Sequence, residues 1–381
     1  MSEDRSVRAM REIGRINAFF PILPALGNRW AAKRPWEGRT VALNLHLTTL
    51  TAGLVRELTL GGGTWVVSAA NPHTTDPGAV DLLRNHGLTV YTGGDLEDRH
   101  GQVLAHEPSL LVDVGFDLIA RAADRGAPVT AAVEITRSGI TRLRKHPGLP
   151  FPVVNLNDGR LKDKVENRHG VGEALWQAVA RLTGMHLAGR RVLLIGYGAV
   201  GRGIAAYARA AGCSVEVVER DPIRRLFAHY DGYPTPNLQR GLSSASVVVT
   251  ATGAAGSLPV SALRGARDGV VLVNAGHGGD EIDVAGIEEH ADSRDDIAPQ
   301  VETWHLPGGP SVTLLGHGHP LNIVLNSGSP EPVLLHFGLL GLTLEWLTTQ
   351  RGLSPGELVV PEALERTAAE HALGALGASP A

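Results

Sequence analysis

The chain has 381 residues, with 35 basic and 39 acidic side chains and a formal net charge of −4. This length predicts two domains, each able to bury its own core. The absence of a lysine- or arginine-rich block excludes nucleic acid as an expected partner. The apolar run of residues 16–26 is interrupted by prolines and is too short to span a bilayer. The single cysteine, Cys213, in a predicted strand, fits a reducing cytoplasm, so we expect a soluble cytoplasmic protein without a membrane partner.

The N-terminal half alternates short apolar runs with helical patterns. Predicted strands cover residues 39–47, 64–68, 88–91, 110–114 and 129–133, and predicted helices cover residues 49–60 and 77–85. A parallel crossover needs a dozen or more residues, and the spacing of these strands allows one each time. The pattern therefore predicts parallel βαβ units in one open α/β sheet.

A dinucleotide-binding pattern stands in the second half of the chain. A predicted helix over residues 171–183 and a strand over residues 191–195 precede the stretch "GYGAVGRG". Its glycines Gly196, Gly198 and Gly201 fit G-x-G-x-x-G between a strand and a helix, where the backbone approaches a pyrophosphate at the helix N-terminus.

An acidic residue completes this pattern. A strand over residues 214–218 ends in Glu219, and an acid about 20 residues beyond the glycines binds the adenosine ribose of NAD. Arg220, Arg224 and Arg225 follow it and would suit a 2′-phosphate, but a carboxylate at the ribose position outweighs exposed arginines. We therefore predict NAD rather than NADP.

Two more predicted strands, residues 246–250 and 270–273, end in the polar loops "TATG" and "NAGHGGDEID". Ligands of open sheets bind outside the carboxyl ends of the strands. Thr252, Asn274 and His277 are therefore expected to face the cofactor. By position alone, His277 is equally consistent with a capped loop histidine.

Several sequence blocks together resemble the S-adenosylhomocysteine hydrolase family in order and spacing. These blocks are "LHLTTLTAGL", "SAANPHTTD", "NDGRLKDKVENRHGVGEAL", "GYGAVGRG", "ERDP", "TATG" and "NAGHGGDEID". The resemblance extends over nearly the whole chain and implies an α/β protein with two Rossmann-like, doubly wound parallel-sheet domains. It implies a discontinuous substrate domain of residues 1–167 and 328–381, with an NAD-binding domain of residues 168–327 inserted between the two segments.

The resemblance also implies a reaction on a small nucleoside substrate. Bound NAD oxidises the ribose 3′-hydroxyl, the ketone acidifies the C4′ proton, the 5′-thiol is eliminated, water adds and the ketone is reduced. Lys162 and Glu166 occupy the positions of an acid/base pair, and residues four apart share one face of a helix. An ordinary surface ion pair has the same spacing. His46 matches the histidine of L-H-x-T and His277 that of N-x-G-H, both near the reacting sugar.

The resemblance assigns further residues to the cofactor and the substrate. The cofactor set is Gly196, Gly198, Ala199, Val200, Gly201, Glu219, Arg220, Thr250, Thr252, Asn167, Asn274 and Asn322. The substrate set is Thr48, Thr51, Asn71, Thr75, Thr136 and Ser329. Thr48 and Thr51 alternatively serve the start of the helix after the first strand. No metal site is expected, because His317 and His319 lack a third ligand at standard spacing.

Four positions depart from the family pattern. Leu50, Val114 and Ile135 stand where the family has acids, and the family's G-H-P motif is matched to "GSP", which places Ser329 at its histidine. Losing several buried hydrogen-bonding groups changes substrate choice, so we expect oxidation by bound NAD with an altered substrate pocket, as in a specialised-metabolism paralogue. A net NAD-dependent sugar or nucleoside dehydrogenase or epimerase, and a non-catalytic NAD-binding regulator, remain alternatives.

The end of the sequence bears on assembly. The family ends in a tail with lysine and tyrosine that reaches the NAD site of a neighbouring subunit, whereas this sequence ends in "ALGALGASPA". We therefore expect readier cofactor exchange, and a homodimer or homotetramer.

Overall fold

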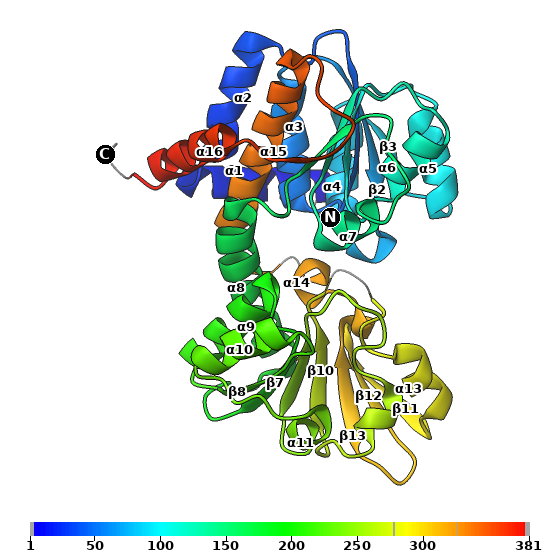
Figure 1. The fold of residues 1–381 in the computed structure, drawn as a ribbon, viewed down its shortest axis with the longest axis vertical. Coiled ribbons are helices and arrows are strands. Elements are labelled where there is room, and N and C mark those ends of the chain that lie inside the picture. The colour runs from blue at the N-terminus through cyan, green and yellow to red at the C-terminus, as the bar shows by residue number, and fades with distance from the viewer. Residues whose placement is uncertain (1–3, 277–278, 326, 378–381) are drawn as a thin grey trace. The chain divides into compact units, whose positions relative to one another are not determined.

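The computed structural model describes residues 4–276, 279–325 and 327–377. The chain divides into two compact units (Figure 1): unit 1 comprises Met1–Lys162 with Pro330–Ala381, and unit 2 comprises Asp163–Ser329. The boundaries predicted from the sequence, at residues 167/168 and 327/328, lie a few residues from these.

Unit 1 contains a seven-stranded parallel sheet in the order β14-β6-β5-β4-β1-β2-β3. Its strands are β1 (Thr40–Leu45), β2 (Thr64–Ala69), β3 (Thr89–Tyr91), β4 (Leu110–Asp113), β5 (Ala131–Glu134), β6 (Pro152–Asn155) and β14 (Gly356–Val359). The first six strands along the chain have the doubly wound order 3-2-1-4-5-6, which reverses direction between β1 and β4. Ligands of such sheets bind at the carboxyl ends beside this reversal.

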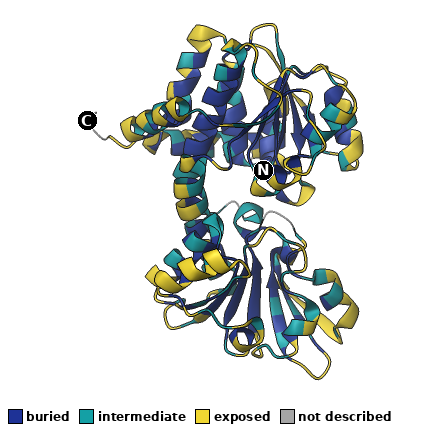
Figure 2. Cartoon of the chain, in the orientation of Figure 1, coloured by how far each residue is buried: buried dark blue, intermediate teal, exposed yellow. Residues whose placement is uncertain are grey.

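Helices cover this sheet, and its inner strands are buried, whereas the edge strand β14 is partly exposed (Figure 2). They are α1 (Arg5–Phe19), α2 (Ile22–Lys33), α3 (Thr49–Thr59), η1 (Pro72–Thr74), α4 (Pro77–Asn85), α5 (Leu96–Leu104), α6 (Asp117–Asp124), α7 (Arg137–Leu143), α15 (Glu331–Thr349) and α16 (Glu362–Ala375). Helix α15 packs against α2, α3 and α16, and is apolar on nearly all sides because these neighbours surround it.

Unit 2 contains a second seven-stranded sheet, in the order β11-β12-β13-β10-β9-β7-β8. Its strands are β7 (Arg191–Ile195), β8 (Ser214–Val218), β9 (Val247–Thr250), β10 (Val270–Asn274), β11 (Ser293–Ala298), β12 (Val301–His305) and β13 (Ser311–Leu315). Strands β11, β12 and β13 pair antiparallel, whereas the other neighbours pair parallel. The sequence did not predict the antiparallel edge. Two Rossmann-like sheets were predicted and are confirmed.

Unit 2 begins with the π-helix η2 (Lys162–Gly170), whose first residue closes unit 1. The remaining helices are α8 (Val171–Thr183), α9 (Ala199–Ala210), α10 (Pro222–Tyr230), α11 (Leu238–Leu242), α12 (Val260–Leu263), α13 (Val284–His290), η3 (Gly316–Gly318) and α14 (Leu321–Val324). The predicted helix over residues 171–183 and strand over residues 191–195 coincide with α8 and β7. None of the helices in the described ranges is long and apolar enough to cross a membrane.

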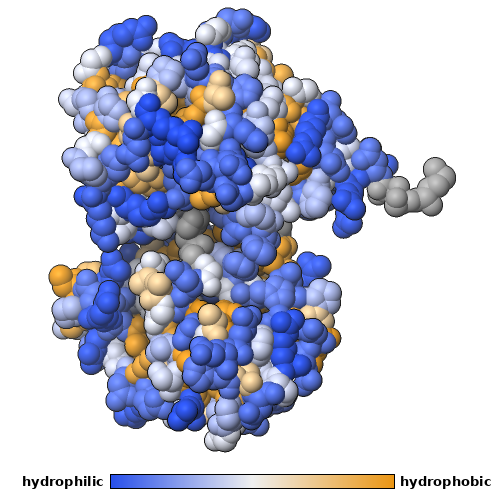
Figure 3. Space-filling view, turned by 90° about the vertical axis from the view of Figure 1, so that its right-hand side faces the viewer, coloured by the Kyte–Doolittle hydropathy of each residue, from blue (hydrophilic) through white to orange (hydrophobic). Residues whose placement is uncertain are grey.

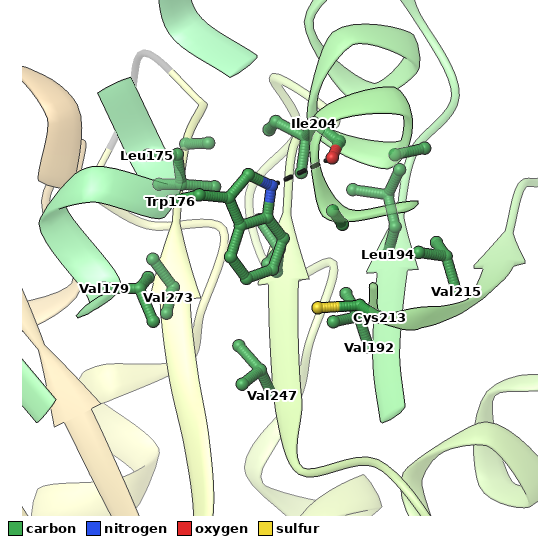
Figure 4. Close-up of a cluster of buried hydrophobic side chains, with 14 of the residues drawn as sticks. Leu175, Trp176, Val179, Val192, Leu194, Ile204, Cys213, Val215, Val247 and Val273 are labelled. Atoms are coloured by element: carbon green, nitrogen blue, oxygen red, sulfur yellow. Dashed lines mark hydrogen bonds between the residues drawn. The ribbon is translucent and has the colours of Figure 1, made fainter. Parts of the chain in front are cut away.

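The core between α8, α9 and the sheet of unit 2 is shown in Figure 4. The indole N–H of Trp176 donates to the carbonyl of Ile204 at 2.9 Å, which ties α8 to α9. Cys213 lies just before β8 rather than within it, and burial raises the pKa of its thiol. A buried, protonated thiol is unreactive. The face drawn in Figure 3 is mostly hydrophilic, with small scattered apolar patches.

Candidate functional site

The glycine-rich turn after β7 has the geometry of a pyrophosphate cradle. Gly196 has φ of 102°, and a Cβ atom there would lie 2.6 Å from the carbonyl oxygen of Ala251. A Cβ on Gly201 would collide with the carbonyl of Gly196. Gly198 caps α9, and a Cβ there would meet no atom closer than Arg224 Nη1, at 3.8 Å. A side chain is therefore excluded at Gly196 and Gly201, whereas the space beside Gly198 is free. This free space fits a phosphate group at the N-terminus of α9.

Two other features of this turn match the expected nucleotide site. Ala199 and Val200 form the start of α9, where backbone N–H groups have no partner within the helix. Glu219 follows β8, and its carboxylate accepts hydrogen bonds from the N–H groups of Tyr197, at 2.7 Å, and Asp221, at 2.9 Å. These bonds fix the carboxylate beside the turn and leave acceptor capacity for a ribose diol. Arg220 is exposed next to it.

Polar side chains at the carboxyl ends of β9 and β10 brace one another. The hydroxyl of Thr250 donates to Asn274 Oδ1 at 3.1 Å, and that oxygen also accepts from the N–H of Gly276 at 2.8 Å. Asn274 Nδ2 donates to the carbonyl of Gly318 at 2.9 Å. Thr250 and Asn274 are fully buried, so they hold the strand ends together beneath the surface on which a cofactor would lie.

Glu281 is a member of this region that the sequence did not predict. Its fully buried carboxylate accepts from the N–H and hydroxyl of Thr252, both at 2.8 Å, and from the N–H of Gly253 at 2.7 Å. Burial raises the pKa of Glu281. The hydroxyl of Thr252 is therefore engaged inside the protein, and Glu281 fixes the loop after β9. Glu281 could have been found from the sequence as an acid in the glycine-rich loop that follows the predicted strand of residues 270–273.

Three other predicted residues of unit 2 have different outcomes. His277 lies outside the described residues. Asn322, on α14, and Ser329 are half-buried, and their assigned roles stay predictions. The sequence Gly-His-Pro itself stands at residues 318–320, where Pro320 bridges to Asn274. A Gly-His-Pro sequence thus lies beside the end of β10 as a second candidate for this motif, and the match to Ser329 stays a prediction.

In unit 1, His46 follows β1 at the point where the strand order reverses. Its Nδ1 lies 2.6 Å from the hydroxyl oxygen of Thr74. Thr51 donates its hydroxyl to the His46 carbonyl at 2.7 Å, and Thr48 Oγ1 accepts from the N–H of Thr51 at 3.3 Å. Thr48 is the N-cap of α3. Both threonines thus serve the start of α3, and this network positions His46.

The other predicted substrate residues also have internal partners. Asn71 caps η1, and its carbonyl accepts the hydroxyl of Thr75 at 2.9 Å. Thr136 caps α7, accepts from the N–H of Gly115 at 2.9 Å and donates to Glu134 at 2.6 Å. These bonds shape the loops at the carboxyl ends of β2 and β5.

Two fully buried acids lie at the ends of β4 and β5. Asp113 accepts from Asn44 Nδ2 at 2.7 Å and from the N–H of Ile119 at 2.9 Å. Burial raises the pKa of Asp113 to about 7. Burial and the neighbouring Asp113 raise the pKa of Glu134, which accepts from the N–H groups of Gly115 and Phe116. Both acids hold in place the loops in which Val114 and Ile135 stand where the family pattern has acids.

Lys162 and Glu166 lie in η2, which is a π-helix and not the α-helix whose i, i+4 spacing the sequence suggested. Isolated π-helical turns occur frequently at functional sites. Glu166 is buried. His336 on α15 is also buried, and its pKa is lowered well below the usual range by burial and by the charge of Lys162. The charge of Lys162 thus acts on a residue of α15, an interaction within unit 1 that the sequence did not predict.

Leu50, the first departure from the family pattern, lines a small pocket between α1, α2, α3 and α15. The lining residues are Ile13, Ile16, Asn17, Leu23, Leu50, Gly53 and Leu334. The amide of Asn17 is the one polar side chain in this lining. The Leu50 pocket is therefore apolar, with a single group able both to donate and to accept hydrogen bonds.

Comparison with known proteins agrees with this geometry. Residues 167–328 match the family model of the S-adenosyl-L-homocysteine hydrolase NAD-binding domain. The chain is 35% identical to a protein of Methanopyrus kandleri named S-inosyl-L-homocysteine hydrolase, over 94% of this chain and 88% of that one. It is 33% identical to an adenosylhomocysteinase of Pyrobaculum aerophilum, over 94% and 89%, and 31% identical to one of Thermotoga maritima, over 96% and 94%. The chain therefore belongs to the S-adenosylhomocysteine hydrolase family of NAD-dependent enzymes.

Proposed function

We propose that this enzyme uses bound NAD to oxidise a ribose-type secondary hydroxyl, the 3′-hydroxyl of a nucleoside or nucleoside-like substrate. The oxidation enables elimination and addition at C5′. The substrate pocket is altered from that of its relatives. The observation that carries the altered specificity is Leu50 itself, an aliphatic side chain beside a small apolar pocket, at a position where the family pattern has an acid. The fit of the turn at Gly196, Gly198 and Gly201 to a pyrophosphate supports NAD as the cofactor.

NAD supplies a reversible hydride acceptor when it is bound. We assign the removal of the hydroxyl proton to Lys162, with Glu166 as its acidic partner. The buried His336 supports this role. Its lowered pKa keeps the imidazole neutral, so it adds no second positive charge near Lys162. We assign to His46 a part in moving the C4′ proton, since its ring is held by Thr74 at the end of β1.

Leu50 favours a base other than adenine. A glutamate only accepts hydrogen bonds and suits an exocyclic amino group, whereas Leu50 offers no acceptor. The pocket has a volume of about 10 Å³, which is room for one water molecule and not for a purine ring, so the amide of Asn17 does not identify the base. A base without an exocyclic amino group does not need the acceptor that Leu50 lacks, and this suits an oxo-purine. The relative from Methanopyrus kandleri is named for such a nucleoside. An oxo-purine nucleoside thioether is therefore the substrate class that we propose.

The test measures NADH absorbance after the NAD-loaded protein is mixed with S-inosyl-L-homocysteine, S-adenosyl-L-homocysteine, inosine or adenosine. A burst with the inosine compounds that exceeds the burst with the adenosine compounds supports the proposal. A burst with the adenosine compounds alone overturns the altered base, and no burst with any compound overturns the oxidation. Lys162→Ala should abolish the burst and retain NAD. Lys164→Ala, an exposed lysine paired with Asp163, should keep the burst.

A net dehydrogenase or epimerase is the second candidate, and Val114 favours it. This residue is buried, aliphatic and unable to move a proton. An enzyme that stops at the ketone releases NADH, and one that returns the hydride to the other face yields an inverted alcohol. Release of free thiol without either product would exclude this candidate. Membership of a family of enzymes already removes the non-catalytic regulator.

A further inference from the structure

A basic pocket lies at the edge of the unit 2 sheet opposite the glycine-rich turn. Its volume is about 620 Å³, and its lining includes His186, Arg190, Arg191, Ser244, Ser246 and Arg267. Arg191 begins β7 and Ser246 directly precedes β9, so the pocket lies at the amino ends of these parallel strands. The cofactor turn follows the carboxyl end of β7. This arginine pocket is therefore separate from the cofactor site.

The lining carries strong positive charge without compensation. Three of its side chains are guanidinium groups, which stay protonated, and no acid contributes to it. Within the described part of the chain, Arg190, Arg191 and Arg267 form no ion pair with a carboxylate. Three uncompensated guanidinium groups in one hollow repel one another, and an anion between them removes that repulsion.

Hydrogen bonds hold two of these guanidinium groups in place. Arg267 Nη1 donates to the hydroxyl oxygen of Ser246 at 2.9 Å, and Arg190 Nε donates to the carbonyl of His186 at 3.2 Å. Ser246 is buried, and its hydroxyl proton has no acceptor among the described residues. The backbone N–H of Ser246 donates to the Arg191 carbonyl at 2.8 Å, so the rim belongs to the rigid sheet. A ligand would therefore meet donors that are already oriented.

We propose that the arginine pocket binds the diphosphate group of a small phosphorylated molecule. Guanidinium groups form paired hydrogen bonds with phosphate oxygens, and three of them match the charge of a diphosphate. The volume lies within the range of about 300–1,000 Å³ typical of small-ligand sites and exceeds the need of one phosphate. The Ser246 hydroxyl supplies an additional neutral donor.

Calorimetric titration of the full-length, NAD-saturated protein with sodium pyrophosphate tests this proposal. Saturating NAD keeps the glycine-rich turn occupied, so the titrant reports on the arginine pocket. We expect one saturable site whose affinity falls as salt is added, because salt screens charge attraction. Arg267→Gln and Arg191→Gln should each raise the Kd about tenfold or more, which corresponds to about 1.4 kcal/mol. Ser246→Ala should raise the Kd less.

Arg264→Gln is the matched control. Arg264 is an exposed arginine in the same unit that does not line the pocket, and its replacement removes the same charge. The Kd of this variant should equal that of the wild type. Absence of saturable binding by the wild-type protein would overturn the proposal, and so would equal weakening by Arg264→Gln and Arg267→Gln. Retained NAD and an unchanged circular dichroism spectrum establish that each variant is folded.

Discussion

Replacing Asp113 with asparagine should flatten the dependence of unfolding free energy on pH between about 5 and 7. Asp113 is fully buried, and its pKa rises from 3.8 to about 7 in the folded protein. A carboxyl whose pKa is raised by folding retains its proton in the folded state over this interval. Its contribution to stability is therefore complete below about pH 4 and is lost as pH rises to about 7.

The size of the effect follows from this retained proton. While the folded state holds one more proton than the unfolded state, each pH unit lowers the unfolding free energy by about 1.4 kcal/mol. Asp113 and Glu134 titrate as a pair, because the charge of Asp113 helps to raise the pKa of Glu134. Asp113→Asn removes one titrating group and also lowers the pKa of the other. Both changes reduce the slope.

The substitution also shifts the absolute stability. Asparagine keeps one acceptor oxygen, so either Asn44 Nδ2 or the N–H of Ile119 loses its present acceptor. A buried donor without a partner costs about 1–3 kcal/mol, and this cost does not vary with pH. The slope of stability against pH is thus the informative quantity.

Urea unfolding at several pH values above 5, followed by near-UV circular dichroism, measures this slope. Trp30, Trp36 and Trp65 report on unit 1, because their rings pack edge to face in its core. Working above pH 5 avoids carboxylates such as Glu345, whose pKa is lowered by hydrogen bonds from Arg29 and Lys33 although burial opposes the shift. Asp98→Asn, at an exposed aspartate, should retain the wild-type slope. Equal slopes for the wild type and Asp113→Asn would refute this reasoning.

Three further substitutions test the nucleotide-binding residues of unit 2 and the Leu50 pocket of unit 1. Gly201→Ala should lower the affinity for NAD more than tenfold, because the Cβ of the alanine collides with the Gly196 carbonyl. A fluorescence titration with NADH measures this affinity, and a change of less than twofold would contradict the prediction. Glu281→Gln removes one hydrogen-bond acceptor from the loop after β9, so the free energy of unfolding should fall by about 1–3 kcal/mol. Thermal unfolding measures this change, and an unchanged Tm would show that Glu281 does not stabilise the loop. Leu50→Glu should raise the burst with adenosine relative to inosine, and an unchanged ratio would show that Leu50 does not read the base.

The cofactor half of the site was predictable because its signals are local. Gly196 and Gly201 stand where a side chain would collide with the backbone, and β7, which leads into the turn, is an apolar run after Arg191. The edge strand β11 was missed for the opposite reason. Its sequence "SRDDIA" is exposed along its whole length, so no apolar alternation marks it as a strand. Its pairing with β12 comes from tertiary context.

The bracing of the substrate half was not predictable, because its partners are distant in the sequence. Asn44 donates to Asp113 from a strand 69 residues away, and no spacing rule connects them. The electrostatic effect of Lys162 on the pKa of His336 is of the same kind, because the two residues lie far apart in the sequence. The π-helical form of η2 was also hidden, since an α-helix fits the same letters and the choice depends on packing around Lys162 and Glu166.

The positions of the departures favour a changed substrate over a decayed site. Val114 and Ile135 each follow a retained buried acid, Asp113 or Glu134, at the end of a strand. Successive side chains of a strand point in opposite directions, so the retained acid and its replaced neighbour meet different surroundings. The acids hold loop N–H groups and are needed whatever the substrate, whereas Val114 and Ile135 are buried and offer no side-chain hydrogen bond. The retained acids therefore keep both loops in place, and the aliphatic residues beside them support our proposal of an altered substrate pocket.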